Sequence, residues 1–273
     1  MKTLYVSDLD GTLLRSNETT SDYTNQTINE LVERGMTFSY ATARSFHTSH
    51  KVTKGLNARI PLIIYNGTMV VDNKDGSFLL KNFFDVDGVT LIQDLLQNDI
   101  FPIVYAFIEG EEKFSYIRTK CSPGMKMFID SRENDKRANP VQSIYDLLKG
   151  EIFYITCIDE EYKLEPLFEK YKDRYHCVFQ VDIYTKQQWL EIMPKQASKA
   201  NAIKQLKEHL GCDRIVAFGD GINDIDMFEI ADEAYAVENA VSELKQIATA
   251  VIGSNNDDGV AKWMLEHYQD EKY

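Results

Sequence analysis

The chain has 273 residues, of which 44% are hydrophobic, and a formal net charge of −13. This length and apolar content allow one large domain or two moderate ones, each with a real core. The acidic balance argues against nucleic acid and anionic membranes as partners, because binding to either needs clustered Lys and Arg.

No stretch approaches the roughly 18 apolar residues of a spanning helix, and the apolar part of MKTLYVSD is too short for a signal peptide. We therefore expect a soluble, cytoplasmic protein. The four cysteines are scattered and form no C-x-x-C pair, which is typical of reduced, mostly buried thiols. They are Cys121, Cys157, Cys177 and Cys212.

The first third of the chain alternates predicted strands and helices. Strands are predicted at residues 4–7, 36–41 and 61–65. A helix between the first two is expected to have Thr24 as its N-cap, an apolar stripe of Ile28, Leu31 and Val32, and Gly35 just beyond its end. This alternation predicts a parallel sheet with right-handed crossovers.

The pattern changes after the third strand. Asp75 and Gly76 indicate the turn of a small hairpin between residues 69–71 and 78–80. From about residue 84 the pattern becomes that of a separate α+β unit. Its helices are expected near 86–97, 125–131 and 162–171, and its strands at 101–108, 113–117, 152–158, 177–183 and 188–192.

The α/β alternation then resumes. Ser198 is expected to cap a helix that ends at Gly211, with Ile203, Leu206 and Leu210 on its apolar face. Further strands are predicted at 215–218, 234–237 and 251–252. The sequence thus predicts an α/β fold: a doubly wound, Rossmann-like core at 1–84 and 191–273, with an α+β domain inserted at 85–190.

Two short acidic motifs follow predicted strands at opposite ends of the chain. DLDGT occupies positions 8–12 and GDGIND occupies 219–224. If their strands are neighbours, Asp8, Asp10, Asp220 and Asp224 converge at the carboxyl edge of the sheet, where such sheets bind ligands. Two like charges about 4 Å apart repel by roughly 4 kcal/mol at an effective dielectric near 20. The group therefore needs protonation or a metal, and hard oxygen ligands favour Mg²⁺.

These motifs carry a family resemblance. DLDGTLL near the start, Thr42 after the second strand, Lys199 opening a late helix, and GDGINDIDMF together resemble the haloacid dehalogenase superfamily. The chain is most similar to its Cof-like phosphatases, which insert a large cap after the third strand. The resemblance covers nearly the whole chain, although the 85–190 domain matches a cap only in position and size. It implies that this domain closes over the site and supplies most substrate contacts.

The resemblance implies four catalytic residues. Asp8 would attack phosphorus and form an aspartyl phosphate, and Asp10 would act as general acid and then general base. Thr42 would donate a hydrogen bond to the phosphoryl group. Lys199 would neutralise phosphoryl charge and orient Asp8; Lys195 is a weaker candidate for that task.

Magnesium and phosphate ligands also follow from the resemblance. It implies that Mg²⁺ is bound by the Asp8 carboxylate, the Asp10 backbone carbonyl and Asp220, with Asp224 bound directly or through water. The family commonly has Thr-Gly-Arg where this chain has Thr42-Ala43-Arg44. Asn223 is expected either to hydrogen-bond a ligand or to cap a helix. The residues that the resemblance implies as contacts for substrate and phosphate are Leu9, Gly11, Thr42, Ala43, Arg44, Lys199 and Asn223.

We therefore expect a magnesium-dependent phosphatase that acts on a small phosphorylated metabolite, such as a sugar phosphate or phosphorylated cofactor. A phosphomutase with the same intermediate is one alternative, and a non-catalytic protein that binds metal and phosphate is another. His47 and His50 are compatible with a metal pair, but no third ligand follows them, so an exposed or capping role is favoured.

Overall fold

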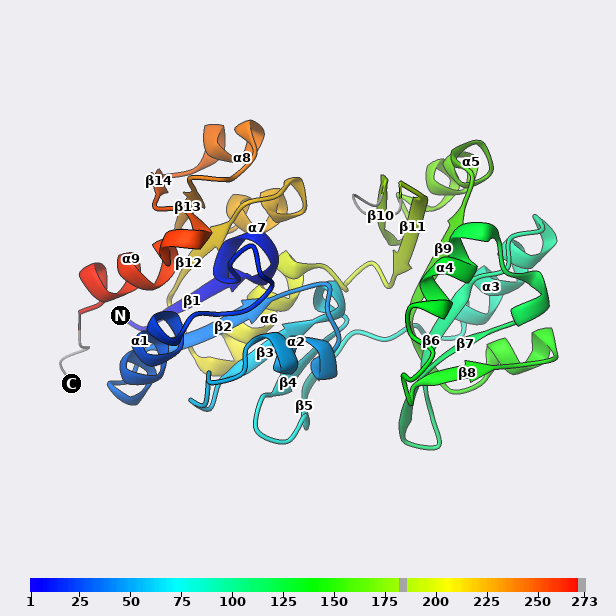
Figure 1. Cartoon of the computed structure of the whole chain (residues 1–273), viewed down its shortest axis with the longest axis horizontal. Helices are drawn as coiled ribbons and strands as arrows, with labels where there is room; N and C mark the ends of the chain where they lie inside the picture. Colours follow the sequence, from blue (N-terminus) through cyan, green and yellow to red (C-terminus); the bar gives the residue numbers. More distant parts are fainter. Residues whose placement is uncertain (182–185, 270–273) are drawn as a thin grey trace. The chain divides into compact units, whose positions relative to one another are not determined.

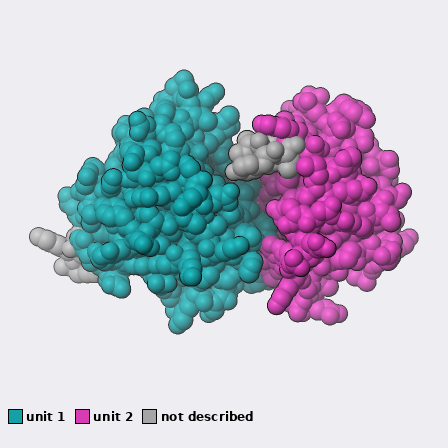
Figure 2. Space-filling model, in the orientation of Figure 1, with its two compact units in different colours: residues 1–81, 198–273 teal, residues 82–197 magenta. Residues whose placement is uncertain are grey.

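The structure, a computed structural model, describes residues 1–181 and 186–269. The chain forms two compact units (Figure 1, Figure 2). The core unit comprises Met1–Lys81 and Ser198–Tyr273, and the inserted unit comprises Asn82–Ala197. Among the described residues, no helix is both long and apolar enough to cross a membrane.

The core unit is built on an eight-stranded sheet of order β14-β13-β12-β1-β2-β3-β4-β5 (Figure 1). The strands from β14 to β3 are parallel, whereas β4 and β5 add an antiparallel hairpin at one edge. This confirms the predicted α/β class with a central parallel sheet. The strands are β1 (Thr3–Asp8), β2 (Thr37–Ala41), β3 (Pro61–Ile64), β4 (Met69–Asp72), β5 (Phe78–Lys81), β12 (Arg214–Gly219), β13 (Glu233–Val237) and β14 (Ala250–Ile252).

Helices of the core unit bury amphipathic faces against this sheet and against each other. In the first helix, Ile28 and Leu31 are buried as predicted, and Val32 is half-buried. In the late helix, Ile203 and Leu206 are buried, whereas Leu210 is half-buried. The helices are α1 (Asp22–Glu33), α2 (Phe46–Val52), α6 (Lys199–Leu210), α7 (Ile225–Glu229), α8 (Ser242–Ile247) and α9 (Gly259–His267).

The two predicted helix caps have different outcomes. Ser198 caps α6 as expected, since its side chain accepts from the Asn201 N–H. The prediction for Thr24 is wrong, because the cap of α1 is Ser21, whose hydroxyl accepts from the Thr24 N–H. The Thr24 hydroxyl instead donates to Asp258. Serine and threonine are both favoured at N-caps, so the sequence alone does not distinguish the two positions. In the structure, Ser21 has the extended backbone of an N-cap, whereas Thr24 lies inside the helix.

The inserted unit is an α+β structure around a six-stranded sheet of order β10-β11-β9-β6-β7-β8. Its neighbours are antiparallel except β7 and β8, which are parallel. Two helices, α3 and α5, bury apolar side chains with this sheet in one core cluster. The elements are α3 (Asp87–Gln97), β6 (Ile103–Ile108), β7 (Glu111–Tyr116), α4 (Pro123–Asp130), β8 (Ala138–Pro140), β9 (Glu151–Asp159), α5 (Glu161–Tyr171), β10 (His176–Val181) and β11 (Gln188–Met193).

Three sequence expectations for the inserted unit need adjustment. No strand was expected between 117 and 152, whereas residues 138–140 form β8, which pairs with β7. The expected boundary at 190/191 falls inside β11, whereas the pairing of β11 with β9 and β10 places the whole strand in the inserted unit. The predicted strand at 177–183 is seen through residue 181, and residues 182 and 183 lie outside the described part.

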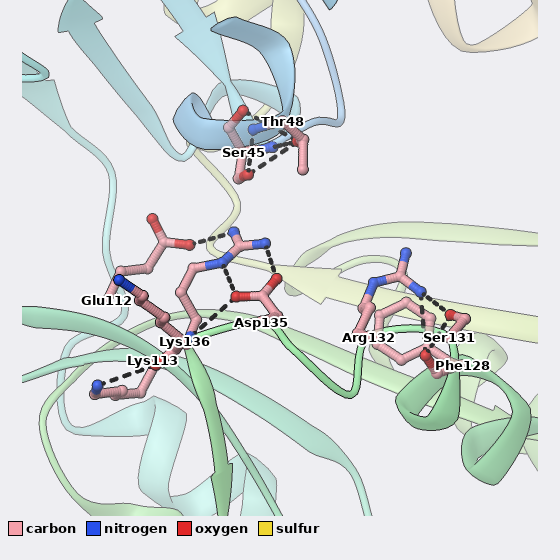
Figure 3. Close-up of polar contacts among 10 residues, drawn as sticks. Ser45, Thr48, Glu112, Lys113, Phe128, Ser131, Arg132, Asp135 and Lys136 are labelled. Carbon is pink, nitrogen blue, oxygen red and sulfur yellow. Dashed lines mark hydrogen bonds and ion pairs between the residues drawn. The ribbon is translucent and has the colours of Figure 1, made fainter. Parts of the chain in front are cut away.

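Charged side chains also hold the inserted unit together (Figure 3). Arg137 donates to the carboxylates of Glu112 and Asp135, with N–O distances of 2.7 and 2.6 Å. The Arg132 guanidinium lies over the Phe128 ring, 3.6 Å from its centroid. These contacts tie β7, the end of α4 and the segment before β8 to one another.

Candidate active site

The two acidic motifs meet at the carboxyl ends of neighbouring parallel strands. Strand β1 pairs with β12 in a register that places Ser7 opposite Phe218, so the chain leaves both strands at adjacent points. Carboxylate oxygens of Asp8, Asp220 and Asp224 all lie within 4.8 Å of one another. The structure therefore brings together three of the four aspartates that the sequence singled out.

Lys199 is the cation at the centre of this group. It is the first residue of α6 and only 3% exposed. Its Nζ lies 2.5 Å from Asp8 Oδ1 and 2.7 Å from Asp224 Oδ1. Burial lowers the pKa of Lys199, but the Asp224 and Asp8 carboxylates outweigh burial and raise it. The ammonium therefore stays charged, and the two carboxylates offset its unfavourable place at a helix N-terminus.

One ammonium does not balance three carboxylates. Burial, the largest cause, together with the neighbouring Asp224 and Asp220, raises the pKa of Asp8 despite its contact with Lys199. Burial also raises the pKa of Asp220 to about 6. A buried, oxygen-only and electron-rich donor set of this kind fits a hard divalent cation such as Mg²⁺. The residues present therefore fit the metal that the family implies.

Asp224 is anchored by the backbone around it. Its Oδ2 accepts from the N–H groups of Asp220 and Gly221, at 3.0 and 3.1 Å. Its side chain is fully buried, against β12. Gly219 permits this approach, because a Cβ there would lie 2.8 Å from the Asp224 Cβ. Asp224 is thus fixed at the site.

The loop that follows β1 closes around Asp220. Thr12 Oγ1 donates to Asp220 Oδ1 at 2.7 Å. Gly11 has a positive φ of 83°, and a Cβ at this position would lie 2.3 Å from Asp220 Oδ2, so only glycine fits. The Leu9 side chain is fully buried in the core, so that residue can reach a ligand only through its main chain.

Asp10 lies outside the buried group and is held by Arg44. Arg44 Nε lies 2.8 Å from Asp10 Oδ2, and Arg44 Nη2 lies 2.5 Å from Asp10 Oδ1. Glu18 also accepts from Arg44, at 3.2 Å. From the sequence we expected Arg44 to contact the substrate. In this structure its guanidinium instead donates to both carboxylate oxygens of Asp10.

The segment before α2 fixes Thr42 and Arg44. Thr42 is 1% exposed at the end of β2, and its Oγ1 accepts from the Arg44 N–H at 3.1 Å. Ser45 begins α2 through a capping box with Thr48 (Figure 3). Ala43 is not among the described residues with positive φ, so alanine causes no backbone strain where the family commonly has glycine.

The remaining candidates lie elsewhere or are exposed. Asn223 is exposed in the turn before α7, whose N-cap is Asp224, so the expectation of Asn223 as a helix cap is wrong. Lys195 donates to the Asp173 carbonyl within the inserted unit, at 2.9 Å. His47 and His50 are exposed on α2, as the sequence favoured.

Two contributors to the site were missed from the sequence. Thr12 is part of the DLDGT motif, so its proximity to Asp220 followed from the convergence of the two motifs. Asn239, in the loop after β13, donates from Nδ2 to the Gly11 carbonyl at 2.7 Å. No spacing or motif links Asn239 to Gly11, and only the folded chain shows their contact.

With this geometry in place, the comparison with known proteins is decisive. The sequence profile of the haloacid dehalogenase-like hydrolases matches residues 5–264. The chain belongs to this family. It is therefore an enzyme of the hydrolase class, as the sequence predicted.

Individual relatives cover almost the whole chain. The 5-amino-6-(5-phospho-D-ribitylamino)uracil phosphatase YitU of Bacillus subtilis is 25% identical, and the match covers 97% of each chain. A second phosphatase of that name, YwtE from the same organism, is 27% identical over 93% of this chain and 94% of its own. The X-ray structure of TM0651 from Thermotoga maritima is 27% identical, with a TM-score of 0.77 and coverage of 99% of each chain.

Proposed function

We propose that this haloacid dehalogenase-like hydrolase is a magnesium-dependent phosphatase that cleaves small phosphomonoesters through an aspartyl phosphate. The observation that carries the proposal is the group of three carboxylates within 4.8 Å at the ends of β1 and β12, two of which contact the buried Lys199 ammonium. Phosphatases among its relatives, matched over nearly the full chain, support the reaction class.

The metal would be held by Asp8, Asp220 and Asp224, together with the Asp10 backbone carbonyl. A divalent ion held by these residues would neutralise charge on the phosphoryl oxygens and on the attacking carboxylate. Lys199 adds a fixed positive charge beside Asp8 and Asp224. Because this charge is already buried and oriented, no reorganisation is needed when negative charge develops.

Asp8 is the proposed nucleophile. Its carboxylate attacks phosphorus, the bond from phosphorus to the leaving oxygen breaks, and an aspartyl phosphate forms. Lys199, 2.5 Å from Asp8 Oδ1, holds one carboxylate oxygen and so orients the other for attack. Thr42, which follows β2, and Asn223, which is exposed next to Asp224 in the sequence, are the proposed donors to the phosphoryl oxygens.

Asp10 is the proposed acid and base. It donates a proton to the leaving oxygen in the first step, and in the second it accepts a proton from the water that attacks the aspartyl phosphate. That attack releases inorganic phosphate and restores Asp8. Arg44 fixes the plane of the Asp10 carboxylate by donating to both of its oxygens.

The proposed substrates are small phosphorylated metabolites. YitU and YwtE are named for a substrate that carries a phosphate on a sugar-alcohol chain, so sugar phosphates and phosphorylated cofactor precursors belong first in a substrate screen. The inserted unit is the proposed cap that contributes substrate contacts.

Phosphate release tests the proposal directly. The protein should hydrolyse a generic aryl phosphate in the presence of Mg²⁺, lose this activity on chelation, and regain it when Mg²⁺ is added back. Activity that is untouched by the chelator would exclude the metal role. Release of an isomer of a sugar phosphate in place of inorganic phosphate would favour a phosphomutase.

A further inference from the structure

Two asparagines far from the catalytic motifs hold the loop that follows β1. Asn239 Nδ2 donates to the Gly11 carbonyl at 2.7 Å. Asn239 Oδ1 accepts the Asn255 N–H at 3.0 Å, and Asn255 Nδ2 donates to the Leu14 carbonyl at 2.8 Å. The two side chains therefore bind both ends of the segment from Gly11 to Leu14.

The bond to Gly11 fixes a peptide that would otherwise have conformational freedom. Gly11 has a φ of 83° and no side chain, so rotation of the peptide that follows it meets little steric resistance. A donor on its carbonyl selects one orientation of this peptide. The next residue is Thr12, whose hydroxyl holds Asp220 Oδ1 at 2.7 Å. Asn239 thus acts on Asp220 through one peptide and one hydroxyl.

The loop that carries Asn239 also holds the second acidic motif. The Val241 N–H donates to the Asp220 carbonyl at 2.9 Å. The same short loop after β13 therefore contacts the DLDGT segment with a side chain and the GDGIND segment with its backbone. This arrangement fixes the two motifs relative to each other at the point where they share the proposed metal.

Because Asn239 is exposed, its effect on the geometry of the site can be tested separately from any effect on folding. Asn239 is exposed, so water can satisfy its partners if the side chain is removed. An exposed hydrogen bond of this kind contributes little net stability, because water competes for both partners. Asn255, in contrast, is 6% exposed, and its loss would leave the Leu14 carbonyl without its amide donor. Asn239 is thus the position at which geometry can be perturbed while the fold is kept.

We propose that Asn239 is a positioning residue for the metal and phosphate site, acting through the Gly11–Thr12 peptide on Asp220. The inference rests on the proposed function, because it assigns Asn239 to the same site. Contacts of this kind, one step removed from a metal ligand, typically change metal affinity or activity by about 10–100-fold.

Two substitutions at Asn239 and one control test the proposal. Asn239→Asp keeps an oxygen that can accept the Asn255 N–H but cannot donate to Gly11, and Asn239→Ala removes both bonds. The control is Asn256→Asp, the same substitution at another exposed asparagine. Within the described part of the chain, the Asn256 side chain bonds Ser16, accepting its N–H at 3.0 Å and donating to its hydroxyl at 2.9 Å.

Magnesium binding is measured by calorimetry and turnover by phosphate release, with thermal unfolding recorded for each variant. Both Asn239 variants should bind Mg²⁺ about tenfold more weakly or worse and lose kcat by a similar factor. Their KM should stay within about twofold and their Tm within about 2 °C of wild type, because water can replace the exposed side chain and small losses shift Tm little in a chain of this size. Asn256→Asp should match wild type in every measurement.

Three results would overturn the inference: wild-type Mg²⁺ affinity in Asn239→Ala, losses in both Asn239 variants that follow a fall in Tm, or an equal loss in Asn256→Asp. A wild-type protein that binds Mg²⁺ but releases no phosphate from any substrate would refute the proposed function alone. The calorimetric comparison would still decide the role of Asn239.

Discussion

The proposed nucleophile, Asp8, and the proposed acid and base, Asp10, lie in different surroundings. Asp8, Asp224 and Lys199 are 5%, 0% and 3% exposed, and the Lys199 ammonium donates to both carboxylates. Asp10 and Glu18, in contrast, keep 49% and 59% of their side-chain surface exposed, with Arg44 between them. Fixed charges are effective where water is excluded, whereas proton exchange needs access to solvent. Two aspartates of one motif can therefore serve two tasks.

The largest expected effect is on the buried side. Asp8→Asn should reduce phosphate release by at least about a thousandfold, because the amide is not a nucleophile. The matched control is Asp22→Asn, at an exposed position in the first turn of α1, which should keep full activity. Steady-state phosphate release checks both. An Asp8→Asn protein that keeps more than a thousandth of the rate would remove the covalent step from the account.

Lys199→Met should act on activity and on stability together. Turnover should fall by about a hundredfold or more, as for other pre-oriented charges. Without metal, breaking a buried ion pair costs about 3–5 kcal/mol, because the remaining carboxylates stay buried and unbalanced. Mg²⁺ should therefore raise the Tm of the variant more than that of wild type. An equal rise in the two proteins would show that Lys199 and the metal do not share these carboxylates.

Arg44→Lys tests the exposed side. A lysine cannot make the two-pronged contact with Asp10, so the acid should be less well oriented. We expect a loss of about tenfold on alkyl phosphates, whose leaving oxygen needs a proton, and a much smaller loss on aryl phosphates. Arg34→Lys, at the exposed end of α1, is the control. Equal losses on both substrates would instead place Arg44 on the phosphoryl group, as the sequence suggested.

The pH dependence of stability should be reversed by metal. The folded-state pKa of Asp220 is raised to about 6, above its usual 3.8, so the native state binds more protons than the unfolded state between these values. The metal-free protein should therefore gain stability as pH falls from about 7 to 4, in the part that Asp220 contributes. Mg²⁺ should cancel or invert this trend. Thermal unfolding across pH, with and without Mg²⁺, measures it, and Asp220→Asn should flatten it.

The smallest expected effect is at Ala43. Because this residue does not occupy a positive φ, restoring the glycine that the family commonly has relieves no strain. Ala43→Gly should leave kcat and KM within about twofold and lower stability by roughly 0.4–1 kcal/mol, through the freer unfolded chain. A gain in activity would show that alanine limits the placement of Arg44.

Sequence patterns predicted what depends on short-range periodicity and on motifs. The strands before Asp8 and Asp220, the cap at Ser198 and the inserted α+β unit all follow from local signals. The choice of Ser21 over Thr24 as a cap, and the pairing that makes β8 a strand, depend on partners distant in the chain. Asn239 is a similar case, since its bond to Gly11 joins residues 228 positions apart. Arg44 shows a further limit of sequence-based prediction. The sequence gives the charge of this residue, but it does not say whether the guanidinium contacts Asp10 or the substrate.

In the proposed reaction, a metal held by Asp8, Asp220 and Asp224 would support attack of Asp8 on phosphorus. A crystal structure with Mg²⁺ and beryllium fluoride, a mimic of the phosphoryl group, tests it most directly. The account predicts the fluoride group bonded to an Asp8 carboxylate oxygen and the metal among these three aspartates. A fluoride group on another residue, or a metal bound away from Asp8 and Asp220, would contradict it.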